Sequence, residues 1–255
     1  MVQEVSWGDG SGGKIYLSCQ ATEGDQTVLV SSDANTGLES RTKEIAFSTS
    51  EGGTAITRSL SVTQESDFKR VQYLSCNGKS AIDTGIVVES TDEIGIDYQL
   101  HSLSQGGDKF MLSCKQGYSG GGIWFETYGN GNKWYVRFGS SSSVSVQNDT
   151  FITGRHTAIL KKQSCKIDGT TLVTPNYSSM PNTTLNFGGR ITSSGVTGFY
   201  GYIYECWIKD KDGLYKFHGF PYVRKSDSKA GFGDTVSGDF QESVLNAFVA
   251  GPDVQ

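Results

Sequence analysis

Apolar and polar residues alternate along many short segments of this chain, a pattern that favours strands with one buried face. Residues 93–100 show it most clearly, with Ile94, Ile96, Tyr98 and Leu100 on one side of an extended strand. Further strand candidates are residues 109–114, 123–128, 133–138, 156–160, 184–187 and 199–209. Helical periodicity is weak and confined to residues 241–248. We therefore predict an all-β protein.

The first quarter of the chain repeats the pattern on a smaller scale. Strand candidates at residues 14–19, 27–30, 43–47 and 58–63 are separated by clusters of turn-forming residues. Short strands at this spacing point to a β-sandwich. The polar step Glu65-Ser66-Asp67 then separates two apolar patterns. We predict a small sandwich over residues 1–66 and a larger one over residues 67–255.

The sharpest local signal is a hairpin over residues 123–138. Asn130-Gly131 is a preferred pair for a two-residue turn in which both central residues need positive φ. Such a turn places Trp124 opposite Arg137, Glu126 opposite Tyr135 and Tyr128 opposite Lys133. One face of the hairpin is then core, and it carries Ile123, Phe125, Thr127, Trp134, Val136 and Phe138.

The opposite face of this hairpin combines aromatic and charged side chains, and it carries Trp124, Glu126, Tyr128, Lys133, Tyr135 and Arg137. Aromatic planes can cover the apolar face of a sugar ring while charged groups bond its hydroxyls, so these six residues are candidates for glycan binding. Two other interpretations stay open. The face can be an ordinary solvated strand face with cross-strand pairs such as Glu126 with Tyr135 and with Arg137 stacked on Trp124, or it can form a subunit interface.

Two motifs that suggest chemistry have simpler interpretations. Asp210-Lys211-Asp212-Gly213 resembles the start of a calcium loop, which makes Asp210 and Asp212 weak candidates for a metal site. The Asp-Gly pair is equally a hairpin turn, and we predict that role. Residues 117–121 match the pattern of a serine nucleophile elbow, but a strand follows where that motif needs a helix.

A paired-carboxylate mechanism is also disfavoured. Glu93 and Asp97 point to the same side of one strand but lie about 13 Å apart along it, too far for either geometry of glycoside hydrolysis. We therefore expect a protein that is not an enzyme, and no cofactor other than a calcium ion that surface loops could hold.

The composition of the chain excludes some classes of binding partner. The formal net charge is -5, from 22 basic and 27 acidic residues, and no basic stripe suits a phosphate backbone, so we expect no nucleic acid. No apolar run is long enough to span a membrane, so we expect no membrane insertion. The five cysteines form no C-x-x-C pair, which favours a reducing compartment. The first residues have no pattern of a secretion signal.

Both ends of the larger predicted domain are similar to a known family. The relevant segments are Tyr73-Leu74-Ser75, residues 82–86, 201–213, 220–225 and 231–240, and Ala250-Gly251-Pro252. They resemble the concanavalin A-like (laminin-G-like) jelly-roll domains of structural proteins from phages that infect gut Bacteroidetes. Residues 35–42 and a strand ending at Val62-Thr63-Gln64 resemble the second half of a BACON-type immunoglobulin-like domain. The resemblance implies an immunoglobulin-like sandwich followed by a jelly-roll sandwich.

The same resemblance implies a function. We expect a non-enzymatic virion structural protein, as a head fibre, capsid decoration or tail-associated adhesin, whose jelly roll binds a host surface glycan. Its expected partners are other virion proteins and copies of itself, most simply in a homotrimer. The expected location is the virion, since a phage protein leaves the cell by lysis and needs no export signal. The alternatives are a bacterial cell-surface carbohydrate-binding protein and a glycoside hydrolase.

Overall fold

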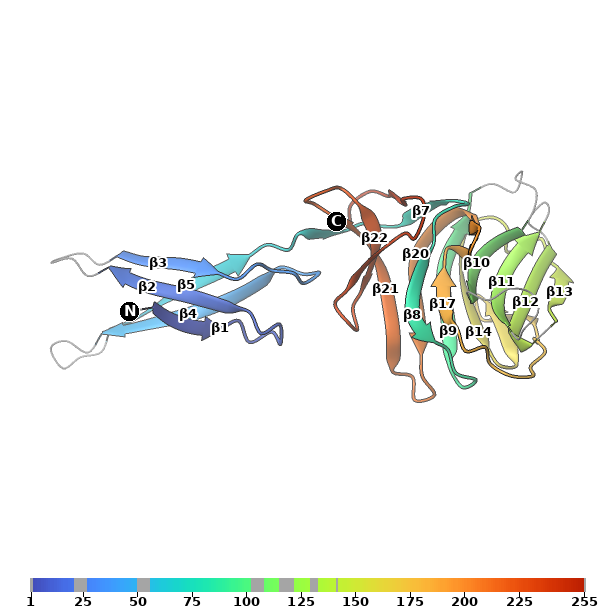
Figure 1. Cartoon of the computed structure of the whole chain (residues 1–255), viewed down its shortest axis with the longest axis horizontal. Helices are drawn as coiled ribbons and strands as arrows, with labels where there is room; N and C mark the ends of the chain where they lie inside the picture. Colours follow the sequence, from blue (N-terminus) through green and yellow to red (C-terminus); the bar gives the residue numbers. More distant parts are fainter. Residues whose placement is uncertain are drawn as a thin grey trace. The chain divides into compact units, whose positions relative to one another are not determined.

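The computed structural model describes residues 2–20, 27–49, 56–101, 108–114, 122–128, 133–140 and 142–254. Strands follow one another throughout, and these residues contain no helix, so the all-β prediction is confirmed (Figure 1). The chain divides into two compact units, Met1–Lys69 and Arg70–Gln255. Strand β6 (Phe68–Arg70) lies at the division.

The small unit is built from two layers. Among its described residues, β1 (Val2–Ser6), β2 (Lys14–Gln20) and β3 (Thr27–Ser32) form a three-stranded antiparallel sheet. Strands β4 (Arg41–Thr49) and β5 (Ile56–Gln64) form a long antiparallel pair. Apolar side chains of both layers meet in one core, which contains Trp7, Ile15, Leu17 and Ile45. The unit is therefore a small β-sandwich.

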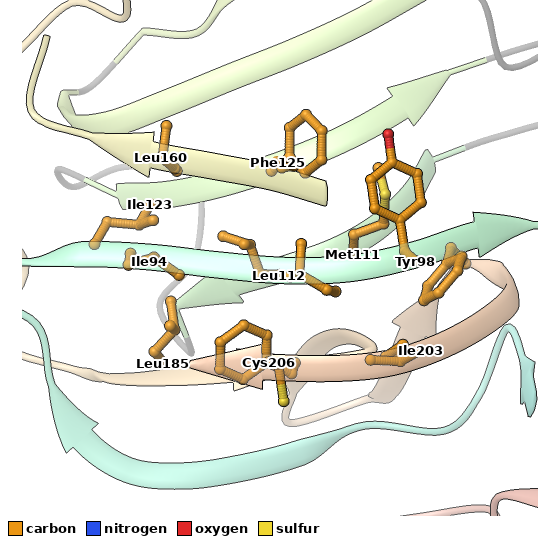
Figure 2. Packing of buried hydrophobic residues seen from close by; sticks show 14 of the residues in the cluster. Ile94, Tyr98, Met111, Leu112, Ile123, Phe125, Leu160, Leu185, Ile203 and Cys206 are labelled. Carbon is orange, nitrogen blue, oxygen red and sulfur yellow. The ribbon is translucent and has the colours of Figure 1, made fainter. Parts of the chain in front are cut away.

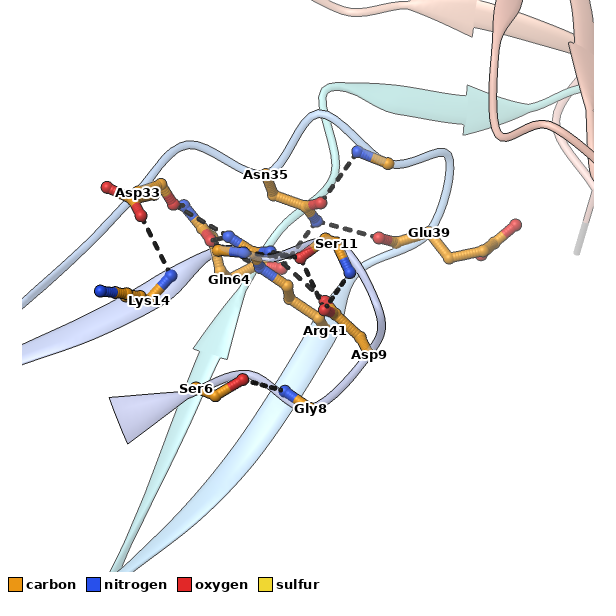
Figure 3. A network of polar contacts seen from close by, with 12 residues as sticks. Ser6, Gly8, Asp9, Ser11, Lys14, Asp33, Asn35, Glu39, Arg41 and Gln64 are labelled. Carbon is orange, nitrogen blue, oxygen red and sulfur yellow. Dashed lines mark hydrogen bonds and ion pairs between the residues drawn. The ribbon is translucent and has the colours of Figure 1, made fainter. Parts of the chain in front are cut away.

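A buried arginine ties the loops of this sandwich together (Figure 3). The Arg41 guanidinium donates to Asp9 Oδ2, Ser11 Oγ and Gln64 Oε1, and to the carbonyl oxygens of residues 33 and 34. It also lies 4.4 Å from the centre of the Trp7 ring. Hydrogen bonds from Ser11, supported by Arg41, lower the pKa of Asp9 to about 2. The cation thus links the 9–13 and 33–40 loops to the end of β5.

The large unit has two facing sheets. The smaller sheet runs, within the described residues, in the order β13 (Val144–Gln147), β12 (Lys133–Ser140), β11 (Gly122–Tyr128), β10 (Asp108–Cys114), β17 (Thr184–Phe187) and β8 (Ile82–Val87). A separate pair, β18 (Gly189–Thr192) and β19 (Gly195–Gly198), forms a short hairpin that lies against β10.

The larger sheet follows the order β16 (Thr170–Val173), β15 (Ser164–Ile167), β14 (Arg155–Lys161), β9 (Glu93–Leu100), β20 (Tyr200–Lys209), β21 (Tyr215–Arg224), β22 (Ala230–Asp234) and β23 (Phe240–Glu242). Strand β7 (Leu74–Asn77) pairs with both β20 and β24 (Val249–Ala250). The last strand of the chain therefore pairs with one of the first strands of this unit.

The hydrophobic core lies between the two sheets. Ile94, Ile96 and Tyr98 of β9 are completely buried, which confirms the alternation predicted for residues 93–100. Their side chains meet those of the opposite sheet, and the Tyr98 ring packs edge-on against Phe125 and Trp134 (Figure 2). Each large apolar side chain buried here contributes about 1.5–3 kcal/mol to folding.

The helical expectation for residues 241–248 is wrong. Phe240 and Gln241 pair with β22, and the backbone N–H of Val244 donates to the Ala81 carbonyl oxygen. The segment thereby satisfies its backbone hydrogen bonds with neighbouring strands. A short segment with weak periodicity gains more from this pairing than from one isolated helical turn, because helix nucleation is costly.

Candidate functional site

The predicted hairpin has the expected register. β11 and β12 pair Trp124 with Arg137, and their neighbouring pairs follow as predicted up to Tyr128 and Lys133. The face predicted to be core is buried at every position, namely Ile123, Phe125, Thr127, Trp134, Val136 and Phe138. The Asn130-Gly131 turn itself lies outside the described residues.

The opposite face of the hairpin has a buried part and an exposed part. Trp124, Glu126 and Arg137 are only 2%, 9% and 6% exposed, so no sugar can stack on that indole. The Arg137 guanidinium lies 3.8 Å from the centre of the Trp124 ring, and the indole N–H donates to Ser143 Oγ at 3.0 Å. The predicted contact of Arg137 with Trp124 is confirmed, but these three residues are buried and not solvated, so they are removed from the candidate glycan site.

The β18–β19 hairpin packs against β10, the strand next to this buried face. Ser113 Oγ donates to the Gly189 carbonyl oxygen, and the Arg190 guanidinium lies 5.0 Å from the centre of the Phe110 ring. Phe110 in turn packs edge-on against Trp124. The β18–β19 hairpin comes more than fifty residues after the predicted hairpin of residues 123–138, so local periodicity could not reveal that the two segments lie close together.

The far end of the hairpin remains accessible. Tyr128 is 47% exposed and meets Tyr135 edge-on, with ring centres 6.1 Å apart. Lys133 Nζ lies 5.2 Å from the Tyr135 ring. Tyr128, Lys133 and Tyr135 are thus the half of the predicted glycan face that a ligand can reach.

A larger aromatic surface lies on the other sheet, where no site was predicted. Tyr73, just before β7, packs against two tyrosines of β20, with ring centres 4.4 Å from Tyr202 and 5.6 Å from Tyr204. All three rings are half-buried and reach the outer surface. We call Tyr73, Tyr202 and Tyr204 the tyrosine platform. The Tyr202-Ile203-Tyr204 alternation is the sequence signal that could have found it, since Ile203 is fully buried.

Polar contacts hold the platform rings in place. The Tyr204 hydroxyl donates to Gln99 Oε1 at 2.8 Å, and the Tyr202 hydroxyl lies 3.2 Å from His101 Nδ1. The Arg155 guanidinium lies 4.0 Å from the centre of the Tyr204 ring. Because neighbouring rings and hydrogen bonds already restrict these side chains, a ligand that stacks on them loses little additional side-chain entropy.

A β-bulge brings acidic groups beside the platform. The register of β20 against β9 shifts between Ile203 and Glu205, so that Tyr204 and Glu205 are both accessible and Glu205 lies opposite Asp97. Arg155 Nε and Nη2 donate to the Asp97 carboxylate at 2.6–3.1 Å, and these bonds raise the pKa of Arg155. Glu205 Oε1 lies 2.7 Å from His218 Nε2. Each carboxylate thus has its own partner.

The carboxylates considered for catalysis take part in separate contacts. Glu93 pairs with Lys161 at 2.8 Å and accepts from the Trp207 indole N–H, whereas Asp97 pairs with Arg155. Residues 117–121, which carry the serine motif, lie outside the described part of the chain.

The hairpin turn predicted at Asp212-Gly213 is confirmed, and it is braced by the side chain of Asp210. Asp210 Oδ1 accepts from the backbone N–H groups of Asp212 and Leu214, both at 2.9 Å. Gly213 has a φ of 82°, which a residue with a Cβ rarely adopts. The described residues contain no group of three His, Cys, Asp or Glu side chains that could hold a metal ion. The Asp210 carboxylate oxygen is therefore used by the turn.

Comparison with known proteins adds no identification. No protein-family model matches the chain, and no curated protein matches its sequence. The described residues include no helix long and apolar enough to cross a membrane. Function must therefore be argued from the geometry of the large unit.

Proposed function

We propose that this chain is a non-catalytic recognition protein whose large unit binds a glycan on the tyrosine platform. The observation that supports it is the cluster of three accessible tyrosine rings, which neighbouring side chains hold in place. The surrounding groups offer both donors and acceptors, from Arg155 of β14 and Gln99 of β9, which are cross-strand partners beside Tyr204.

The chemistry of a sugar matches this surface. The C–H groups of a pyranose pack on aromatic faces, while its hydroxyls exchange hydrogen bonds with polar groups at the edge of the rings. Tyrosine suits the task because it supplies a large contact area with only two side-chain torsions to restrict.

Paired variants can test the location of the site. We expect Tyr73→Ala with Tyr202→Ala to remove binding on a glycan array, while Tyr128→Ala with Tyr135→Ala, a matched change of two tyrosines on the hairpin, leaves binding intact. Circular dichroism of both variants verifies folding. Loss of binding in the hairpin variant alone would move the site to Tyr128, Lys133 and Tyr135. Absence of glycan binding by the parent protein would refute the function.

We also propose that the protein belongs to a virion, as a head fibre, capsid decoration or tail-associated adhesin. The support is the resemblance of residues 201–252 to jelly-roll domains of phage structural proteins. Display in a homotrimer and in many copies per particle suits a shallow surface, because weak sites that bind together give strong avidity. A reconstruction of the particle that contains this chain would establish the location. Recovery of the chain from the bacterial cell surface instead would favour a carbohydrate-binding protein of the host.

A further inference from the structure

We infer that the tyrosine platform selects neutral, hydroxyl-rich glycans and discriminates against acidic ones. This inference rests on the proposed glycan-binding function and specifies the class of ligand. It follows from the charges that surround the three rings.

Two carboxylates lie side by side next to the platform. Asp97 and Glu205 are directly opposite each other on β9 and β20, and Glu205 follows the platform residue Tyr204 in the chain. Side chains at opposite positions of neighbouring strands are close together. A uronate or other anionic sugar stacked on Tyr204 would therefore approach two negative charges.

The cation closest to the rings is already engaged. Arg155 stacks on Tyr204 and holds Asp97 through a bidentate pair, and the side chain of Asp97 is only 12% exposed. An anionic ligand that took over the Arg155 Nε and Nη2 donors would displace a carboxylate that water hardly reaches. Removing one partner of such a pair leaves the other charge poorly compensated, which opposes the exchange.

A neutral sugar meets no such conflict. Its hydroxyls can donate to the Glu205 carboxylate, whose side chain is 30% exposed, while Glu205 keeps His218 as its partner, because a carboxylate has about four lone-pair sites. Hydroxyl oxygens can in turn accept from Arg155, whose side chain is 56% exposed. Hydrogen bonds to a charged group are also stronger than those between neutral groups.

One further cation lies on the same sheet. The Arg70 guanidinium lies 3.9 Å from the centre of the Phe220 ring, and that ring packs on His218, the partner of Glu205. Because Arg70 is a cation of this sheet other than the one that Asp97 engages, its substitution supplies a useful control for the attraction of acidic glycans.

The test compares matched oligosaccharides on the intact chain, such as neutral hexose oligomers and the corresponding uronic acid oligomers, by isothermal titration calorimetry. We expect the uronic acid series to bind at least about tenfold more weakly, as for like charges brought together. We also expect binding of the neutral series to change little between about 0.05 M and 0.5 M salt, since no net ion pair forms.

A substitution supplies the internal control. Glu205→Gln removes one negative charge and keeps an acceptor, so the difference between the two series should shrink by about threefold or more while neutral oligomers still bind. Equal or preferred binding of the acidic series, especially if Arg70→Gln abolishes it, would overturn the inference and leave glycan recognition standing. If neither oligosaccharide series binds, and neutral and acidic polysaccharides show no binding either, then glycan recognition and this inference are refuted together.

Discussion

Trp207 packs its indole on Gly95, and this contact predicts how Gly95→Ala changes the stability of the large unit. These residues are cross-strand partners on β20 and β9, and the indole covers the glycine. A Cβ added at Gly95 would lie 1.9 Å from Cε2 and 2.0 Å from Cζ2 of that indole. Because such contacts essentially never fall below 3.0 Å, Gly95→Ala must displace the ring by at least 1.1 Å.

The cost follows from the burial of the ring. Trp207 is only 8% exposed, and truncation of a buried tryptophan to alanine costs about 3–5 kcal/mol. A gap of about 1 Å forfeits about a quarter to a half of the dispersion energy, or about 1–2.5 kcal/mol here. Alanine itself favours a strand over glycine by about 0.5–1 kcal/mol. We therefore expect Gly95→Ala to lower the free energy of unfolding by about 1 kcal/mol and the Tm by about 2–4 °C.

Calorimetry of the intact chain measures this change in the transition of the large unit, and urea unfolding followed by tryptophan fluorescence gives the free energy. The same substitution in a Trp207→Ala background has room for its Cβ, so it should be neutral or stabilising there. This reversal of sign is the signature of a steric conflict between the two residues. An equal loss of stability in both backgrounds, or none in the parent, would refute the reasoning.

Two further predictions concern the small unit and the thiols. Arg41→Met should lower the stability of the small unit by about 2–4 kcal/mol, because it leaves Gln64 Oε1 and the Ala34 carbonyl oxygen without their donor and removes one donor each from Asp9 and the Asp33 carbonyl. Calorimetry should show the transition of the small unit move, while Arg58→Met, at an exposed position of β5, leaves it in place. Burial raises the pKa of the Cys114 thiol to about 11 and that of Cys165 to about 12, so neither should react with a thiol reagent at pH 8 until urea is added. Peptide mass spectrometry would identify the labelled residues, and modification of either cysteine in the native protein would contradict the burial seen here.

The hairpin shows where prediction from sequence succeeded and where it stopped. Its register and core face followed from alternation and from Asn130-Gly131, because successive side chains of a strand point to opposite sides whatever surrounds them. Its outer face was expected to be accessible throughout, yet Trp124 and Arg137 are buried and Tyr128 is exposed. The alternation of apolar and polar residues predicts which side of a strand faces away from the core. It does not predict whether another segment of the chain covers that side.

The tyrosine platform depends still more on tertiary structure. Tyr73, Gln99, Arg155 and Tyr204 lie on or beside four strands, and their separations in the chain exceed twenty residues in every case. Sheet order brings them together, and a single bulge in β20 decides that Tyr204 and Glu205 are both accessible.

Local patterning in the chain predicts the all-β class and the buried sides of strands such as β9, β11 and β12, since these depend on the local geometry of an extended backbone and on the exclusion of apolar side chains from water. The outer surface that a ligand can reach is set by the tertiary fold. It depends on pairings between distant strands and on the β18–β19 hairpin that packs against β10, and no periodic pattern in the sequence reports either of these.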